Sequence, residues 1–450
     1  MRTSKIAITL AIAAFFLTAA AWAQAQAPAA QAQAPATKWK DGEYPLYDAA
    51  LKQTDNLKKI DALKAWEQKF PDSAYKDTRL GLFMIAYEAT NQFDKVLQTG
   101  NEILASNPKD LATIFRMATE GQRIPNPSAE QLGLVEKAAK ALATNLDDLK
   151  PATVADAAWS KEKPNLEALG HATLGWVAEQ RKDLPAAEKA YSQSLGVNPA
   201  NGAASYRLAE VMRQEKDPDK NAAMLFEYAR AAFYTGTGAL TDAGRKEIEK
   251  YITQAYTKFH GSAEGFDELR KLAATQALPP ADLKILSKAE VDLRKEEEFK
   301  KSNPMMALWL TAVKTPLIAA DGNDYFEKNV KGSLLPGGAE GVSKFKGKLV
   351  DAVPAKNPKQ LKIALGDSES PEVTLVFEEP LTGTAPKGTD LEFEGVASSF
   401  TTTPFNVTFE VEKDKLVGWP VQAGTKKGAP GGAAKPKPPA APAKPPAKKP

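Results

Sequence analysis

The chain of 450 residues contains no cysteine and only two histidines, His171 and His260. The lack of cysteine excludes disulfides, a thiolate nucleophile and zinc held by thiolates. Each histidine has a structural explanation: His171 lies at an interhelix packing position, and His260 lies at a predicted helix end, where it can cap carbonyl groups. We therefore expect a protein that is not an enzyme and that has no metal site and no cofactor.

Basic charge is concentrated at the two ends of the chain. The formal net charge is +3, but the segment 421–450 holds seven lysines and no acid, and Arg2 and Lys5 stand near the start. Without these nine cations, the remaining chain has a net charge of −6. Because nucleic-acid binding requires a basic surface, the body of the protein is not expected to bind nucleic acid.

The first residues have the features of an export signal. The apolar run Ile6–Ala20 follows Arg2 and Lys5, and small residues suited to cleavage stand at Ala21, Ala23 and Ala25. A run of about 15 residues is shorter than the roughly 20 that a spanning helix needs, so an uncleaved anchor is the lesser alternative. We predict a signal peptide at 1–23, a flexible leader at 24–39, and a periplasmic or extracellular location.

The segment 421–450 is rich in lysine, proline and alanine. This composition predicts an extended, disordered tail. Weak attraction to an anionic envelope surface and use as a proline-rich peptide ligand are the alternatives.

Between residues 40 and 299 the apolar periodicity is helical, and its most regular stretch is Leu166–Pro199. Gly175 allows a second helix to approach the first, Ala187 keeps the crossing tight, Tyr191 fills the gap between the helices, and Pro199 ends the second helix. The complete set of markers is His171, Leu174, Gly175, Ala178, Ala187, Tyr191, Asn198 and Pro199. Their spacing resembles the tetratricopeptide repeat (TPR), a unit of two antiparallel helices.

The same spacing occurs in two earlier units. Leu46 precedes Pro71, Phe83 precedes Pro108, and Leu174 precedes Pro199, each by 25 residues. Because a unit of this kind cannot bury its apolar face alone, we expect about five stacked repeats at 40–235. The segment 149–164 is predicted to be an insertion, mainly a loop with a short helix. Capping and connecting helices are expected at 236–320, with helices over 241–258, 264–275 and 280–301.

The resemblance to TPR proteins also implies a binding surface. In that family the first helices of successive repeats line a concave groove that holds protein or peptide partners. Trp176 and Glu210 are then expected to face this groove, with Tyr206, Arg207 and Arg213 as neighbours. A mixture of tryptophan, tyrosine and arginine is typical of binding hot spots. The alternative is that Trp176 packs against the preceding insertion.

After residue 345 the pattern changes to alternation over short segments. Five strands are predicted, at 345–350, 361–365, 373–377, 391–396 and 407–411. The sequences Lys346-Gly347-Lys348 and Lys387-Gly388-Thr389-Asp390 resemble the OB-fold group called tRNA-anticodon-like. This resemblance implies a small five-stranded barrel within 321–420.

These observations predict a mostly α protein, a TPR-like α-solenoid with capping helices followed by an OB-like β-barrel. The expected function is that of a non-catalytic interaction scaffold or assembly factor of a bacterial envelope. One alternative is an accessory module that binds a ligand or a sugar through the barrel. The other is a nucleic-acid binder using the barrel, which nine lysines against thirteen acids between Glu340 and Pro420 disfavour.

Overall fold

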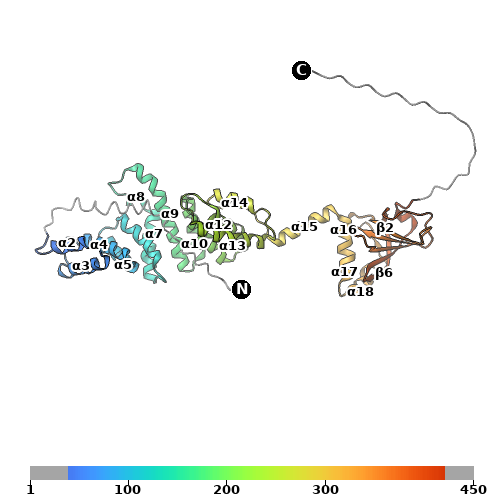
Figure 1. Ribbon diagram of the computed structural model, residues 1–450, viewed down its shortest axis with the longest axis horizontal. Helices are drawn as coiled ribbons and strands as arrows, with labels where there is room; N and C mark the ends of the chain where they lie inside the picture. The colour runs from blue at the N-terminus through green and yellow to red at the C-terminus, as the bar shows by residue number, and fades with distance from the viewer. Residues whose placement is uncertain (1–38, 421–450) are drawn as a thin grey trace, which may run out of the picture. The chain divides into compact units, whose positions relative to one another are not determined.

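The computed structural model describes residues 39–420 (Figure 1). The predicted signal peptide, the predicted leader up to residue 38 and the predicted tail therefore lie outside the described residues. The chain divides into two compact units, of which the first ends at Val291 and the second begins at Asp292.

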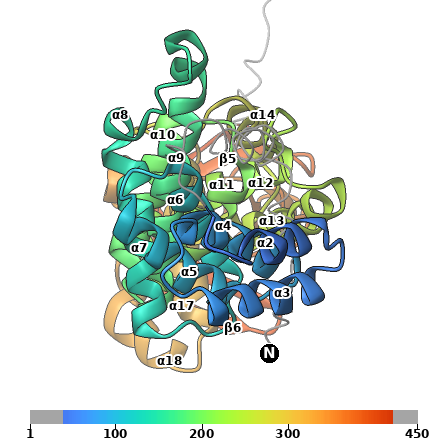
Figure 2. The same ribbon diagram turned by 90° about the vertical axis from the view of Figure 1, so that its left-hand side faces the viewer.

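The first unit is a TPR-like region of helix pairs, each packed on the next (Figure 2). The five pairs are α2 Tyr44–Lys52 with α3 Asn56–Lys69, α4 Lys76–Ala89 with α5 Phe93–Ser106, α6 Leu111–Glu120 with α7 Ala129–Thr144, α9 Asp156–Gln180 with α10 Leu184–Val197, and α11 Gly202–Glu215 with α12 Asn221–Phe233. Aspartate and asparagine side chains cap several of these helices, as Asp110 caps α6, Asp183 caps α10 and Asn201 caps α11.

The marker residues of the best repeat lie where their sizes require. A Cβ atom on Gly175 would lie 2.8 Å from the ring of Tyr191, so only glycine allows α9 to approach α10 this closely. Ala187 and Tyr191 are buried between the helices, and Leu174 is partly buried. Helix α10 ends at Val197, two residues before Pro199.

Helix α9 begins ten residues earlier than the repeat pattern indicates. The predicted insertion at 149–164 contains the end of α8, Leu146–Leu149, and the first turns of α9, with Pro164 inside the helix. A proline in a helix interior costs about 3 kcal/mol. Trp159 and Leu166 flank it on the same helix and are buried in one apolar cluster, which offsets that cost.

Helices α13, Asp242–His260, and α14, Phe266–Thr275, follow the five pairs as predicted. The guanidinium of Arg230 on α12 joins them to the array, because it donates hydrogen bonds to the backbone carbonyls of Pro199, Ala273 and Gln276. The helix predicted from residue 280 starts only at Lys288, as α15, Lys288–Ser302. Ser287 and Glu290 form a reciprocal cap at that point, and prolines at 279 and 280 precede it.

Helical turns at the start of the second unit pack on its strands. They are α16 Pro304–Leu308, a π-helical turn Trp309–Lys314, α17 Thr315–Ile318, α18 Gly322–Tyr325 and a second π-helical turn Phe326–Val330. Trp309 is fully buried in the strand core, and its indole donates a hydrogen bond of 3.1 Å to Glu372. The division of the chain therefore lies before these turns rather than at the predicted residue 320. Among residues 39–420, no helix combines the length and apolar character needed to cross a bilayer.

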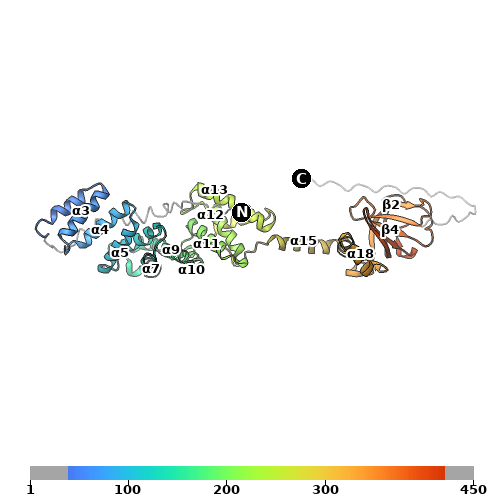
Figure 3. The same cartoon turned by 90° about the horizontal axis from the view of Figure 1, so that it is seen from below.

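Among residues 292–420, the second unit contains eight strands rather than the predicted five. Figure 3 shows some of these strands from below. They are β1 Leu334–Leu335, β2 Phe345–Val353, β3 Gln360–Leu365, β4 Val373–Val376, β5 Asp390–Phe393, β6 Gly395–Thr402, β7 Phe405–Glu410 and β8 Leu416–Val417. The sheet order is β1-β6-β7-β4-β3-β2-β5-β8, with β4 and β7 parallel.

The predicted strand 391–396 is in fact two strands, β5 and β6, separated by Glu394 alone. β5 pairs with β2, whereas β6 pairs with β7 near the other end of the order, so the sheet curls. A Cβ atom on Gly395 would lie 2.6 Å from a methyl group of Val411 and 2.8 Å from the Glu410 carbonyl oxygen, so this break has no room for a larger residue. β1 and β8 have two residues each, too few for an alternation pattern to reveal.

Candidate functional site

Polar side chains connect the first helices of successive pairs, α4, α6, α9 and α11. We call the surface that they form the first-helix face. The links from α4 onward are Glu88 with Arg116, Gln122 in the turn after α6 with the buried Thr173, and Glu179 with Arg207.

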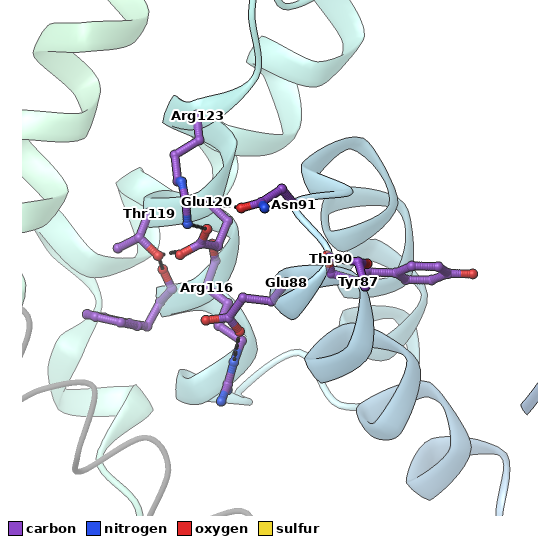
Figure 4. Close-up of polar contacts among 9 residues, drawn as sticks. Tyr87, Glu88, Thr90, Asn91, Arg116, Thr119, Glu120 and Arg123 are labelled. Atoms are coloured by element: carbon purple, nitrogen blue, oxygen red, sulfur yellow. Dashed lines mark hydrogen bonds and ion pairs between the residues drawn. The ribbon is translucent and has the colours of Figure 1, made fainter. Parts of the chain in front are cut away.

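The link between α4 and α6 is part of a charged cluster (Figure 4). The Arg116 Nε atom lies 3.1 Å from a carboxylate oxygen of Glu88, on the neighbouring helix. Arg123, just after α6, donates to Glu120 at 2.8 Å and to Asn91 at 3.2 Å. Burial raises the pKa of Glu120, and Arg123 lowers it in part. Arg116 is thus held by an acceptor on the preceding helix pair, and Arg123 by acceptors from its own pair and the preceding one.

The next two links involve α9. The side-chain amide of Gln122 donates to the Thr173 hydroxyl at 2.9 Å. Farther along α9, the Tyr191 hydroxyl donates to Glu179 at 2.5 Å, and the same carboxylate lies 3.9 Å from the Arg207 guanidinium. Burial raises the pKa of Glu179, while Arg207 and Tyr191 lower it in part. Arg207 therefore ties α11 to α9.

A second cluster lies at α11 and α12, and we call it the tyrosine–arginine cluster: Tyr206, Glu210, Arg213, Tyr228 and Tyr251. Arg213 donates to Glu210 at 2.6 Å and to the Tyr228 hydroxyl at 3.2 Å, and Tyr228 itself donates to Glu210. The rings of Tyr206 and Tyr251 meet that of Tyr228 edge-on, with centroids 6.2 and 4.9 Å away. Burial, with the Glu210 charge, raises the pKa of Tyr228, so its hydroxyl stays protonated.

The structure brings together four of the five predicted groove residues. Tyr206, Arg207 and Glu210 are half-buried and Arg213 is exposed. The fifth prediction, an exposed Trp176, is wrong, because its side chain is only 8% exposed. Trp176 belongs to an apolar cluster with Val154 and Trp159, which confirms the alternative that it packs against the preceding segment.

Sequence reasoning missed Glu179, Tyr228 and Tyr251. Glu179 lies near the C-terminal end of α9, four residues after Gly175, and the repeat markers assign it no role. Tyr228 is on a second helix, so a pattern based on first helices could not select it. Tyr251 lies in α13, where the repeat markers have ended.

A buried carboxyl group lies on α12, next to Tyr228 in the sequence. The Glu227 side chain, on α12, has no exposed surface, and neither of its oxygens makes a hydrogen bond with the described residues. Burial raises its pKa to about 8, with Ser205 and Arg230 opposing the shift. Glu227 is therefore mostly protonated at neutral pH, which is how a protein accommodates an unpaired buried acid.

Neither histidine lies in a catalytic arrangement. His171 is half-buried, and burial lowers its pKa. His260 is buried at the end of α13, with its Nδ1 atom 2.9 Å from the Leu286 carbonyl. Within residues 39–420, no three histidine, aspartate or glutamate side chains are grouped so as to hold a metal ion.

Comparisons with known proteins found likenesses only among solved structures. No protein-family model and no curated protein matches the chain. Among solved structures, a thermophilic TPR protein from Thermus thermophilus is 16% identical, and the match covers 48% of this chain and 98% of that chain, with a TM-score of 0.26. Because this TM-score is low, the TPR-like character rests on the packing of the helix pairs themselves.

Proposed function

We propose that this protein is an exported, non-catalytic interaction scaffold that binds protein or peptide segments along the first-helix face. The observation that carries the proposal is the pair of arginine–glutamate contacts that join first helices, Arg116 with Glu88 between α6 and α4 and Arg207 with Glu179 between α11 and α9. Such a surface extends over several helix pairs, as recognition of an extended segment requires.

The arginines of this face are suited to binding because they are already fixed in position. Arg207 faces Glu179, and Arg213 is held by both Glu210 and Tyr228. Arginine and tyrosine are enriched among the residues that dominate binding energies. A side chain held before the partner arrives loses less conformational entropy on binding. Trp176 is not part of this surface, since it is buried.

The test is co-purification from envelope extracts. The double variant Arg207→Ala, Arg213→Ala removes two cations from the face, so we expect partners recovered with the wild type to be lost or strongly reduced. The matched control, Lys137→Ala with Lys189→Ala, removes two exposed cations from second helices, and it should retain them. Equal recovery by both double variants would contradict binding at this face.

Export and an envelope location are a further part of the proposal. The support is the charged start, the apolar run Ile6–Ala20 and the small residues that follow it. N-terminal sequencing of the protein from the periplasmic fraction should give a mature chain that starts after Ala23 or Ala25. Recovery of the intact N-terminus in the membrane fraction would instead support the uncleaved anchor.

We also propose that the second unit is OB-like. In support, β4 is parallel to β7. The nearly continuous segment 390–402 joins two parts of the sheet, because its first strand, β5, pairs with β2 and its second strand, β6, pairs with β7. The excess of acids over lysines in this part of the sequence argues against a nucleic-acid ligand. Tight, steeply salt-dependent binding of a single-stranded oligonucleotide would reverse that view.

A further inference from the structure

A pocket of about 460 Å³ opens in the first unit, away from the residues of the first-helix face. It is formed by the C-terminal end of α12, the first half of α13 and the second half of α14, and α12 packs against each of the other two helices (Figure 2). Its volume is in the range of ligand-binding sites, roughly 300–1,000 Å³. We call it the α13–α14 pocket.

Positive charge predominates in the lining of this pocket. Four cations line it, Arg245 and Lys246 on α13 with Arg270 and Lys271 on α14, against two acids, Asp242 and Glu249. Asp242 pairs with Arg245. In the part of the chain that the structure describes, no carboxylate forms an ion pair with the other three cations. The pocket thus carries excess positive charge in a protein whose central part is acidic.

Arg245 and Arg270 make the pocket suitable for a ligand that has both an anionic and an apolar part. The Arg245 Nε atom is buried and lacks an acceptor among the described residues. The Arg270 guanidinium lies over the Phe233 ring, 4.5 Å from its centroid, so the aromatic wall and a positive charge are side by side. Ala232 and Ala274 complete the apolar part of the lining.

The arrangement of the cations in the pocket favours an acidic peptide over a compact phosphate as its ligand. Phosphate is best held by a free guanidinium fork or by converging backbone N–H groups. Here the Arg245 guanidinium is engaged by Asp242, and Arg270 is stacked on Phe233. Lys246 and Lys271 are exposed point charges on two different helices. Dispersed charges of this kind suit several carboxylates spaced along a chain.

We infer that the α13–α14 pocket binds an acidic peptide segment of a partner protein, with aspartate or glutamate side chains at the lysines and an apolar side chain against Phe233. This inference goes beyond the proposed function, because the pocket shares no residue with the first-helix face. One scaffold can then hold two partner segments at once, and joining two sites raises the overall affinity through a high effective concentration.

The test uses the full chain and a fluorescein-labelled peptide of alternating glutamate and leucine, with binding followed by fluorescence anisotropy. We expect saturable binding to the wild type. The variant Lys246→Glu, Lys271→Glu should raise the Kd at least about tenfold. The matched control, Lys250→Glu with Lys258→Glu, changes the net charge equally on exposed positions of α13 outside the pocket, and it should keep the Kd within about twofold.

Additional control ligands and one additional variant identify which ligand binds and at which site. A peptide of alternating glutamine and leucine should not bind, and inorganic pyrophosphate should not displace the labelled peptide at equal concentration. Arg207→Ala with Arg213→Ala should leave peptide binding unchanged, so failure of the proposed function would not be mistaken for failure of this inference. Equal weakening in the two lysine double variants, or displacement by pyrophosphate, would overturn the inference, as would no binding of the acidic peptide by a wild-type chain with normal helical content.

Discussion

Replacing Glu227 by glutamine should make the stability of the first unit less dependent on pH. The carboxyl has no exposed surface, and burial raises its pKa from 4.5 to about 8. When the pKa of an acid is higher in the folded protein than in the unfolded chain, its contribution to stability is fully present only below the unfolded pKa. As pH rises from the unfolded pKa toward the folded pKa, this contribution is lost and the free energy of unfolding falls. Glutamine has nearly the same shape and does not titrate in this range.

The magnitude follows from the two pKa values. Between pH 5 and pH 7 the native protein keeps the Glu227 proton that the unfolded chain loses, which lowers the free energy of unfolding by about 2.5 kcal/mol. Over this range the variant should therefore gain about 2.5 kcal/mol relative to the wild type, as an order of magnitude.

Urea titrations followed by circular dichroism at 222 nm, at pH 5, 6 and 7, measure this difference. The control is Glu247→Gln, which makes the same replacement at an exposed position on α13. If the difference between Glu227→Gln and wild type changes by less than about 0.5 kcal/mol from pH 5 to pH 7, the buried carboxyl is ionised in the folded protein. The assignment of a neutral Glu227 would then be wrong.

Three other predictions concern packing and charge. Gly175→Ala should lower the free energy of unfolding by about 1–3 kcal/mol because its Cβ would overlap the Tyr191 ring, whereas Gly196→Ala, which meets no atom within 4 Å, should be neutral or stabilising in the same urea titration. Trp176→Ala should cost about 3–5 kcal/mol by opening a cavity in its cluster, and a loss below 1 kcal/mol would mean that the side chain is exposed. Glu43 should show the opposite pH dependence to Glu227, because its pKa is lowered overall: burial raises it, but hydrogen bonds from Ser73 and Trp66 lower it further. The contribution of Glu43 to stability is therefore lost as pH falls through its folded pKa. The variant Glu43→Gln should remove that acid sensitivity in urea titrations from pH 5 to pH 3.

The helix pairs could be predicted from sequence because their markers act locally. The interval of 25 residues between apolar marker and proline, as from Phe83 to Pro108, reflects one helix, one turn and a second helix, and the structure has helix pairs at these positions. The early start of α9 could not be predicted in this way. Pro164 is a local signal against a helix, whereas the burial of Trp159 that outweighs it is a property of the folded unit.

The candidate site was predictable only where it depended on helix phase. Tyr206, Arg207, Glu210 and Arg213 follow from their positions on one helix, and they do lie together. The burial of Trp176 and the contact of Tyr228 with Glu210 depend on how neighbouring helices cross. In the strands the limit was similar, since the division at Glu394 separates two strands with different partners, β2 and β7, which the alternation pattern does not record.

The contacts of Arg230 determine where this chain can be shortened. A fragment that ends at residue 235, after the fifth pair, would leave that guanidinium without the carbonyls of Ala273 and Gln276 and would expose the apolar side of α12. A fragment that ends at Val291 retains both acceptors. Limited digestion should accordingly release a resistant piece that extends past α14, and shorter pieces should be degraded as soon as they form.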